Sequence, residues 1–211
     1  IEMGDNGTGL RAEVKIRIAV LAAGESRRFG SQKLLATWRG QPLLSYSLRA
    51  AQRACPGGVL LVSGSAAGRI EALATGHADT VAHNPDFAGG IGTSIATAAR
   101  ACAEGVDALL IALGDQPLVT ADHLRAVIAA WDRAANSIVA TAYAGTCGPP
   151  VLFGRAHFAA LGALDSERGA KQMLFEQRER VVTVEFPPAA VDIDTTDDLA
   201  NLGQADSSEQ T

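Results

Sequence analysis

Residues 16–33 read IRIAVLAAGESRRFGSQK, a short apolar run that opens into a polar segment bracketed by Gly24 and Gly30. The run over residues 16–23 is apolar at nearly every position, which is typical of a strand buried on both faces of a parallel sheet. A glycine-containing turn directly after such a strand is where α/β proteins bind ligands, beyond the carboxyl ends of the strands. This stretch therefore predicts an α/β fold with its site at the end of the first strand.

The rest of the chain continues this alternation of short β-branched runs and Ala-rich segments of helical period. We expect strands at residues 16–23, 59–63, 80–83, 108–113, 138–143, 151–153 and 181–186. We expect helices at residues 43–54, 66–75, 93–103, 121–135, 156–164, 170–178 and 196–202. Alternating strands and helices imply βαβ units in a mostly parallel central sheet with helices on both faces. With no repeat or linker visible, we expect one domain over residues 16–203, with flexible termini at 1–15 and 204–211.

Composition excludes several classes of protein. The 211 residues are 47% hydrophobic and carry a net charge of -5, which does not fit a disordered chain or a general nucleic-acid binder. No apolar run approaches the roughly 18 residues of a membrane span. Three scattered cysteines and a polar start without a signal-peptide pattern favour a reduced, cytoplasmic setting.

The segment after the first strand has the composition of a phosphate-binding loop. Glycines allow backbone N–H groups to approach an anion, and the cations between Arg27 and Lys33 would neutralise a polyphosphate. The spacing matches neither G-x4-G-K-[ST] nor G-x-G-x-x-G, so a Walker loop and a dinucleotide fingerprint are both disfavoured. Taken alone, the same segment also fits a solvated loop with incidental basic residues.

Carboxylates follow two of the expected strands. Asp115 comes after residues 108–113, and Asp192 and Asp194 follow the last strand. Mg2+ is commonly held by one or two carboxylates together with substrate phosphates. The structural alternatives are a turn residue for Asp115 and a helix cap for Asp194.

The sequence shows neither a G-x-S-x-G elbow nor a Cys/His constellation, and its four histidines are scattered. Cations and carboxylates without a general base suit a nucleophile that is already ionised. Nucleotidyl transfer to a phosphate group is such a reaction, because the acceptor phosphate attacks the α-phosphorus and pyrophosphate leaves.

Residues 21–35, LAAGESRRFGSQKLL, resemble the LAAGxSxRMGxxKLL signature of MobA-like nucleotidyltransferases, and most closely that of the molybdenum cofactor cytidylyltransferases. The resemblance continues in family order through residues 84–87, 89–94, 114–118, 148–153 and 192–199. It implies a Rossmann-like nucleotidyltransferase fold and an Mg2+-dependent transfer of CMP from CTP to the terminal phosphate of a molybdopterin-type cofactor. A molybdenum-containing apoenzyme would be a transient partner.

The resemblance also implies roles for individual residues. Arg28, Lys33 and Asp115 would be catalytic, with Asp192 or Asp194 completing the metal site that Asp115 begins. The nucleotide would lie against Ala22, Ala23, Gly24, Arg28, Lys33, Asn84 and Ser94. The acceptor would meet Pro149, Pro150 and Lys171.

Two features bear on specificity. Guanylyl-transferring relatives read LAGG, so the Cβ of Ala23 narrows the space for a purine and favours CTP over GTP. Pro149 stands where the family commonly has His, on the acceptor side. That departure leaves a sugar or polyol phosphate open as the acceptor, and a non-catalytic carrier of the finished dinucleotide cofactor is a third hypothesis.

Overall fold

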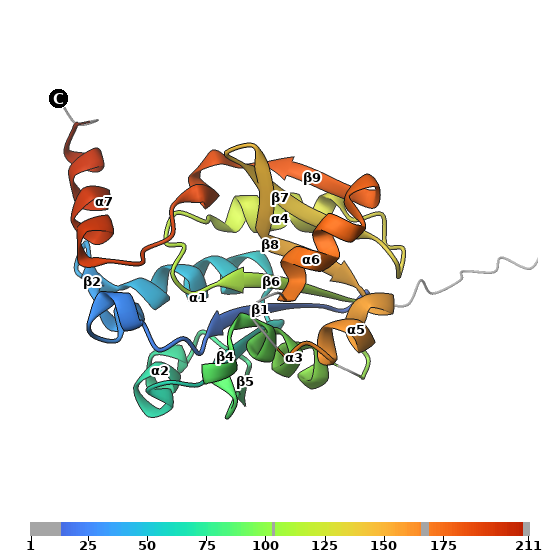
Figure 1. Cartoon of the computed structure of the whole chain (residues 1–211), viewed down its shortest axis with the longest axis horizontal. Coiled ribbons are helices and arrows are strands. Elements are labelled where there is room, and N and C mark those ends of the chain that lie inside the picture. Colours follow the sequence, from blue (N-terminus) through green and yellow to red (C-terminus); the bar gives the residue numbers. More distant parts are fainter. Residues whose placement is uncertain (1–13, 103, 166–168, 209–211) are drawn as a thin grey trace, which may run out of the picture.

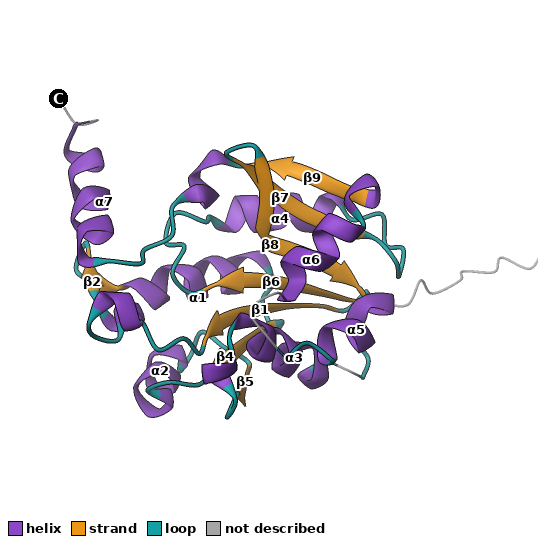
Figure 2. Cartoon of the chain, in the orientation of Figure 1, coloured by secondary structure: helices purple, strands orange, loops and turns teal. Residues whose placement is uncertain are grey.

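The computed structural model describes residues 14–102, 104–165 and 169–208. Its centre is a seven-stranded sheet in the order β5-β4-β1-β6-β8-β7-β9, with helices packed on both faces (Figure 1). The strands are β1 Ile16–Ala22, β4 Val59–Ser63, β5 Thr80–His83, β6 Ala108–Leu113, β7 Ile138–Tyr143, β8 Thr146–Gly154 and β9 Val181–Glu185, with a small hairpin of β2 Thr37–Trp38 and β3 Gln41–Pro42. The helices are α1 Leu43–Ala54, α2 Ala67–Ala74, α3 Ile91–Ala101, α4 Ala121–Ala130, α5 Phe158–Gly162, α6 Gly169–Glu176 and α7 Thr196–Ser208 (Figure 2).

The strand directions confirm the expected mostly parallel sheet. Strand β1 runs parallel to both β4 and β6, and β4 runs parallel to β5. Only β8 runs against its neighbours among these strands, since it is antiparallel to β6 and to β7, while β9 is parallel to β7.

Alternate residues of β1 face different cores, as the two-residue period of a strand requires. Ile18 and Val20 pack into a cluster with residues of α1, α2 and α4. Ala19 and Leu21 pack into a second cluster with residues of α3, α5 and α6. All four side chains are buried, which explains why this strand is apolar throughout.

Three expected elements differ from the observed ones by more than two residues at one end. One is the helix expected over residues 196–202, which continues to Ser208. The helix expected over residues 121–135 ends at Ala130, because Asp132 accepts hydrogen bonds from the Ala134 N–H and the Ser137 hydroxyl and thereby stabilises a turn. The strand expected over residues 151–153 extends from Thr146 to Gly154. Ala144 and Gly145 both have positive φ, as a tight hairpin turn requires, and join β8 to β7.

The chain order creates a switch point between β1 and β6. From β1 the chain moves outward through β4 to β5, and it then returns to form β6 on the other side of β1. Loops that leave two strands in opposite directions open a crevice at their carboxyl ends. The loop after β1 and the residues after β6 therefore meet at this crevice.

Among the described residues, no helix combines the length and apolar character needed to cross a membrane.

Candidate active site at the carboxyl ends of the strands

The loop after β1 is braced by its own side chains. Ser26 adopts a left-handed backbone conformation, and its hydroxyl donates to Gln32 Oε1 over 2.8 Å and accepts from the Lys33 N–H over 3.1 Å. Gln32 Nε2 donates to the Gly24 carbonyl over 3.3 Å. These bonds fold residues 24–33 back on themselves and direct the Lys33 side chain toward the end of β6.

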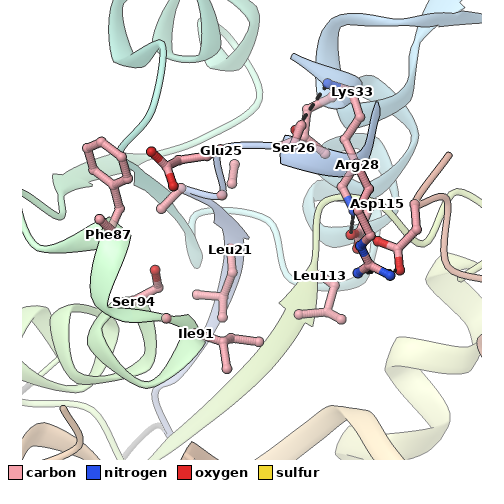
Figure 3. Close-up of a pocket in the computed structure, with 17 residues that line it drawn as sticks. Leu21, Glu25, Ser26, Arg28, Lys33, Phe87, Ile91, Ser94, Leu113 and Asp115 are labelled. Carbon is pink, nitrogen blue, oxygen red and sulfur yellow. Dashed lines mark hydrogen bonds and ion pairs between the residues drawn. The ribbon is translucent and has the colours of Figure 1, made fainter. Parts of the chain in front are cut away.

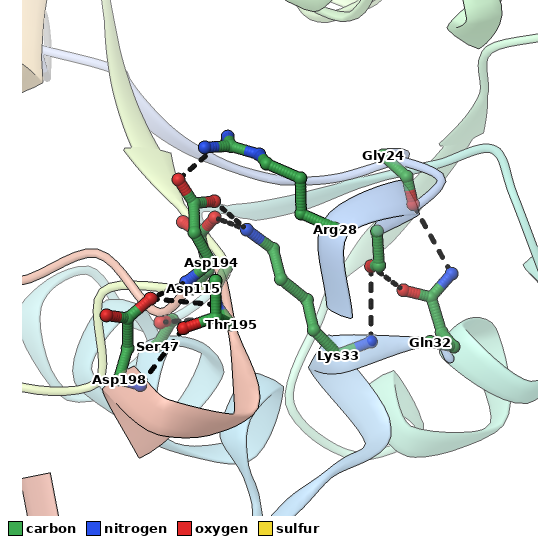
Figure 4. Close-up of polar contacts among 11 residues, drawn as sticks. Gly24, Arg28, Gln32, Lys33, Ser47, Asp115, Asp194, Thr195 and Asp198 are labelled. Carbon is green, nitrogen blue, oxygen red and sulfur yellow. Dashed lines mark hydrogen bonds and ion pairs between the residues drawn. The ribbon is translucent and has the colours of Figure 1, made fainter. Parts of the chain in front are cut away.

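Lys33 lies between two carboxylates from distant parts of the chain (Figure 4). Its Nζ lies 2.5 Å from Asp115 Oδ2 and 2.9 Å from Asp194 Oδ1. The second oxygen of Asp194 lies 2.8 Å from Nη2 of Arg28. The Lys33 side chain is only 13% exposed, whereas that of Arg28 is 75% exposed. The Lys33 side chain is therefore largely enclosed by the site, whereas the Arg28 side chain lies at its solvent-exposed edge.

The charges in this cluster shift two pKa values. Burial alone would lower the pKa of Lys33, but the charges and hydrogen bonds of Asp115 and Asp194 outweigh it and raise that pKa. Asp192 lies nearby, and burial together with the charge of Asp115 raises its pKa to about 6, against a hydrogen bond from Gln116. Asp192 is also exposed to solvent, so a cation can reach these neighbouring carboxylates from that side.

The start of α7 holds Asp194 in place. Asp198 accepts hydrogen bonds from the N–H groups of Asp194 and Thr195, and the Thr195 hydroxyl accepts one from the Asp198 N–H. This reciprocal pattern is a capping box at the helix start. Ile193 is fully buried against Phe29 and Trp38, so the segment that carries Asp194 packs directly on the loop that carries Arg28.

A cavity of about 380 Å³ opens beside this cluster. Its described lining residues come from the end of β1 and the loop after it, from the segment before α3 and the start of α3, from the end of β6 and from the segment before α7. They are Leu21, Ala22, Ala23, Gly24, Glu25, Ser26, Arg28, Lys33, Leu34, Phe87, Ala88, Gly90, Ile91, Ser94, Leu113, Asp115 and Asp194. Figure 3 shows Lys33 and Asp115 at one end of the cavity and Phe87 and Glu25 at the other.

Most of the sequence-predicted nucleotide residues meet in this cavity. Ala22, Ala23, Gly24 and Ser94 line it together with Arg28 and Lys33. Asn84 is 1% exposed and lies behind the wall, where its Nδ2 donates to Thr93 and Ser94 and its Oδ1 accepts from the Asp86 N–H. Asn84 therefore positions the loop that leads into α3.

A second pocket of about 330 Å³ adjoins the cavity, and Ile91 and Leu113 belong to both walls. Its lining is mainly aliphatic and aromatic, and it includes Pro149 and Asp192. Pro150, the other predicted acceptor residue from this turn, is buried beneath, where its carbonyl accepts a hydrogen bond from the Thr141 hydroxyl. Lys171 belongs to α6, but its side chain falls outside the described residues.

The carboxylates fit a metal that is shared with a substrate. Oδ1 of Asp115 is buried and has no hydrogen-bond partner, so one oxygen is left for a further ligand. Within residues 14–102, 104–165 and 169–208, no three His, Cys, Asp or Glu side chains are arranged to hold a metal by themselves. A cation held by one or two carboxylates and by substrate phosphates needs no such trio.

The sequence reasoning missed several cavity residues, and it assigned no catalytic role to the histidines. Glu25, Phe87, Ile91 and Leu113 line the cavity. Glu25 and Phe87 stand inside the quoted motifs, but their direction depends on loop geometry.

Each histidine has a structural hydrogen-bond contact: His77 with Gln52, His83 with Ser63, His123 with Thr141 and His157 with the Asn136 carbonyl.

Comparison with known families matches the MobA-like NTP transferase domain over residues 18–181. The chain belongs to this family. This confirms the resemblance drawn from the motifs, and it makes the chain a nucleotidyltransferase whose donor is a nucleoside triphosphate.

The relatives of this MobA-like transferase that follow are 27% to 32% identical to it. The purine catabolism protein PucB of Bacillus subtilis (strain 168) is 32% identical over 167 residues, 73% of this chain and 78% of the relative. The molybdenum cofactor cytidylyltransferase of Escherichia coli (strain K12) is 27% identical over 181 residues, 85% and 91% of the two chains. A crystal structure of Rv0371C from Mycobacterium tuberculosis H37Rv in complex with manganese is 27% identical, with a TM-score of 0.74 over 91% of this chain and 100% of that one.

Proposed function

We propose that this MobA-like transferase moves CMP from CTP to the terminal phosphate of a molybdopterin-type cofactor. An oxygen of the acceptor phosphate attacks the α-phosphorus of CTP, the bond between the α-phosphorus and its bridging oxygen to the β-phosphate breaks, and pyrophosphate leaves. The acceptor oxygen is already ionised, so the step needs charge neutralisation and alignment more than a general base.

The cations of the first loop supply that neutralisation. Lys33 and Arg28 line the cavity where the triphosphate would lie, and both are held by carboxylates of the same site. When phosphates enter, they offer the two cations stronger anionic partners than Asp194, whose carboxylate is 34% exposed. Lys33 and Arg28 would then stabilise the charge that develops on the leaving pyrophosphate.

Asp115 is the residue we assign to Mg2+, with Asp192 or Asp194 as the second ligand. The buried, unpartnered Oδ1 of Asp115 supports this assignment. Bound there, Mg2+ would neutralise charge on the reacting phosphates. The manganese complex of the Rv0371C relative is in keeping with a divalent metal at such a site.

The lining of the second pocket is the observation that supports a pterin as the acceptor. Its walls include Ile95, Ile111, Val151 and Phe153, and Asp192 is an acidic residue of its lining. A flat heterocyclic ring buries its faces against such walls. If Asp194 is the second metal ligand, Asp192 is left to accept hydrogen bonds from ring N–H groups. A sugar or polyol would bury less apolar surface against these walls than a pterin ring does. The pocket therefore favours a pterin, despite Pro149 in place of His.

Pyrophosphate release with each combination of donor and acceptor tests the proposal. CTP, GTP and ATP are each incubated with Mg2+ and either the molybdenum cofactor or a panel of sugar and polyol phosphates. We expect turnover only with CTP and the molybdenum cofactor. Turnover with GTP, or with a sugar or polyol phosphate alone, contradicts the proposed specificity. Tight binding of the cytosine dinucleotide cofactor without any turnover would instead support a carrier.

A further inference from the structure

The end of the cavity away from the cations has its own chemistry. Glu25 follows Gly24 directly in the chain, and Figure 3 shows its carboxylate directed toward the same end as the Phe87 ring. Phe87 begins a short 3-10 helix, Phe87–Gly89. Both residues line the cavity, whose phosphate end is marked by Lys33 and Arg28. The base of a bound nucleotide points away from its phosphates, toward this end.

Close packing keeps the two segments together. A Cβ on Gly64 would lie 2.7 Å from the Ala23 Cβ and 2.8 Å from the Phe87 Cβ. The segments that carry Ala23 and Phe87 therefore both pack against the Gly64 backbone, with no room for a side chain between them. The Ser65 N–H donates to the Ala23 carbonyl over 3.0 Å and ties the loop after β4 to the loop after β1. Ala23 and Phe87 therefore belong to one packed wall, and Glu25 extends from the loop two residues after Ala23.

Acidic side chains stand at both ends of the cavity. Of the described residues that line it, the acids are Glu25, Asp115 and Asp194, and the latter two bind Lys33 at the phosphate end. Glu25 lies at the base end. A carboxylate accepts hydrogen bonds and repels carbonyl oxygens. It therefore favours a base that presents an amine at this edge.

We propose that Glu25 accepts a hydrogen bond from the exocyclic amine of cytosine, against which Phe87 packs, and that it thereby selects CTP over UTP. This inference rests on CTP as the donor under the proposed function. Cytosine carries an N4 amine where uracil carries the O4 carbonyl, so the two bases differ at the edge that a carboxylate reads. Ala23 would select the base by its size, whereas Glu25 would select it by the hydrogen-bonding groups on its edge.

Equilibrium binding by calorimetry tests this proposal without any acceptor. CTP, UTP and GTP are titrated with Mg2+ into the full chain and into its Glu25→Gln, Glu25→Ala and Glu104→Gln variants. Glu104 is the matched control, because it is exposed and follows the end of α3 opposite to the cavity. We expect the wild-type chain to bind CTP about tenfold more tightly than UTP, as loss of one charged hydrogen bond predicts. Both Glu25 variants should bring the ratio close to one, and Glu104→Gln should leave it unchanged.

The three nucleotides separate failure of this inference from failure of the proposed donor. If the Glu25 variants weaken CTP and UTP equally, Glu25 contacts the shared sugar or shapes the loop, and the inference is overturned. A wild-type chain that binds CTP and UTP equally also overturns it, while CTP turnover stays intact. Preference for GTP over CTP overturns the proposed donor as well.

Discussion

Lys33 Nζ and Asp115 Oδ2 lie 2.5 Å apart across the switch point between β1 and β6. One residue comes from the loop after β1 and the other from the residues after β6. The pair joins the expected phosphate-binding cation to the expected metal ligand, so the two functions that the sequence suggested separately share one electrostatic centre. The raised pKa of Lys33 follows from this contact and from that with Asp194.

Replacing Asp115 by Asn tests its proposed role in holding the metal. The substitution keeps the shape of the side chain but removes its charge, so we expect kcat to fall at least about 100-fold. Pyrophosphate release over a range of Mg2+ concentrations is the measurement. Asp197→Asn is the control, because Asp197 is exposed in the first turn of α7. An Asp115→Asn variant with full activity would rule out the metal role.

The two cations should contribute unequally to nucleotide binding. Lys33 is 13% exposed and Arg28 is 75% exposed, so water screens Arg28 far more strongly. We expect Lys33→Met to weaken CTP binding about tenfold or more, and Arg28→Met about threefold, with the second effect lost at high salt. Titration of CTP at low and high ionic strength measures both, and Arg180→Met, at an exposed position before β9, is the control. Equal losses at high salt would contradict this ranking.

Gly64 and Gly68 form a matched pair for the cavity wall. A Cβ on Gly64 would meet Ala23 and Phe87 at less than van der Waals distance, whereas one on Gly68 meets no atom within 4 Å. We expect Gly64→Ala to cost about 1–3 kcal/mol of stability and to raise the KM for CTP. Gly68→Ala, in the first turn of α2, should be neutral or stabilising by up to about 1 kcal/mol. Denaturant unfolding and steady-state kinetics on both variants provide the measurement. Equal stability of the two variants would show that the wall is not closely packed.

His123 should make stability depend on pH. It is 5% exposed, its Nε2 lies 2.8 Å from the Thr141 hydroxyl, and its ring stacks on Phe186. Burial lowers the pKa of His123 below its ordinary value of 6.5, so the folded chain favours the neutral ring. The resulting stability is fully present above about pH 6.5 and is lost as the pH falls from there through the lower pKa of the folded state.

Unfolding free energies of the wild-type chain and of His123→Gln, measured from pH 8 to pH 5, test this dependence. The wild-type chain should lose more stability on acidification than the variant does. The comparison also removes the contribution of Asp192, whose raised pKa acts in the opposite direction. Parallel pH profiles for the two proteins would contradict the assignment to His123.

The sequence by itself determined the strands that fill the sheet. Residues 59–63, 80–83, 108–113 and 138–143 were predicted with the bounds that the structure shows, because an apolar run with its turn residues is a local signal. The first-loop motif likewise indicated its own chemistry, since Gly24, Arg28 and Lys33 lie within ten residues of one another. The short α4 and the long β8 escaped prediction because side-chain bonds around Asp132 and pairing with β7 decide their ends.

Only the tertiary structure decided which of these residues meet. Placement of β6 beside β1 brings Asp115 to Lys33, and burial of Ile193 against Phe29 brings Asp194 to both cations. Asn84 belongs to one of the family motifs, but its side chain forms hydrogen bonds with Thr93, Ser94 and the Asp86 N–H and does not line the cavity. The second pocket, which we propose for the acceptor, and the direction of Glu25 depend on contacts between segments far apart in sequence. Such contacts leave no periodic or spacing signal in a single chain, so they become visible only once the chain is folded.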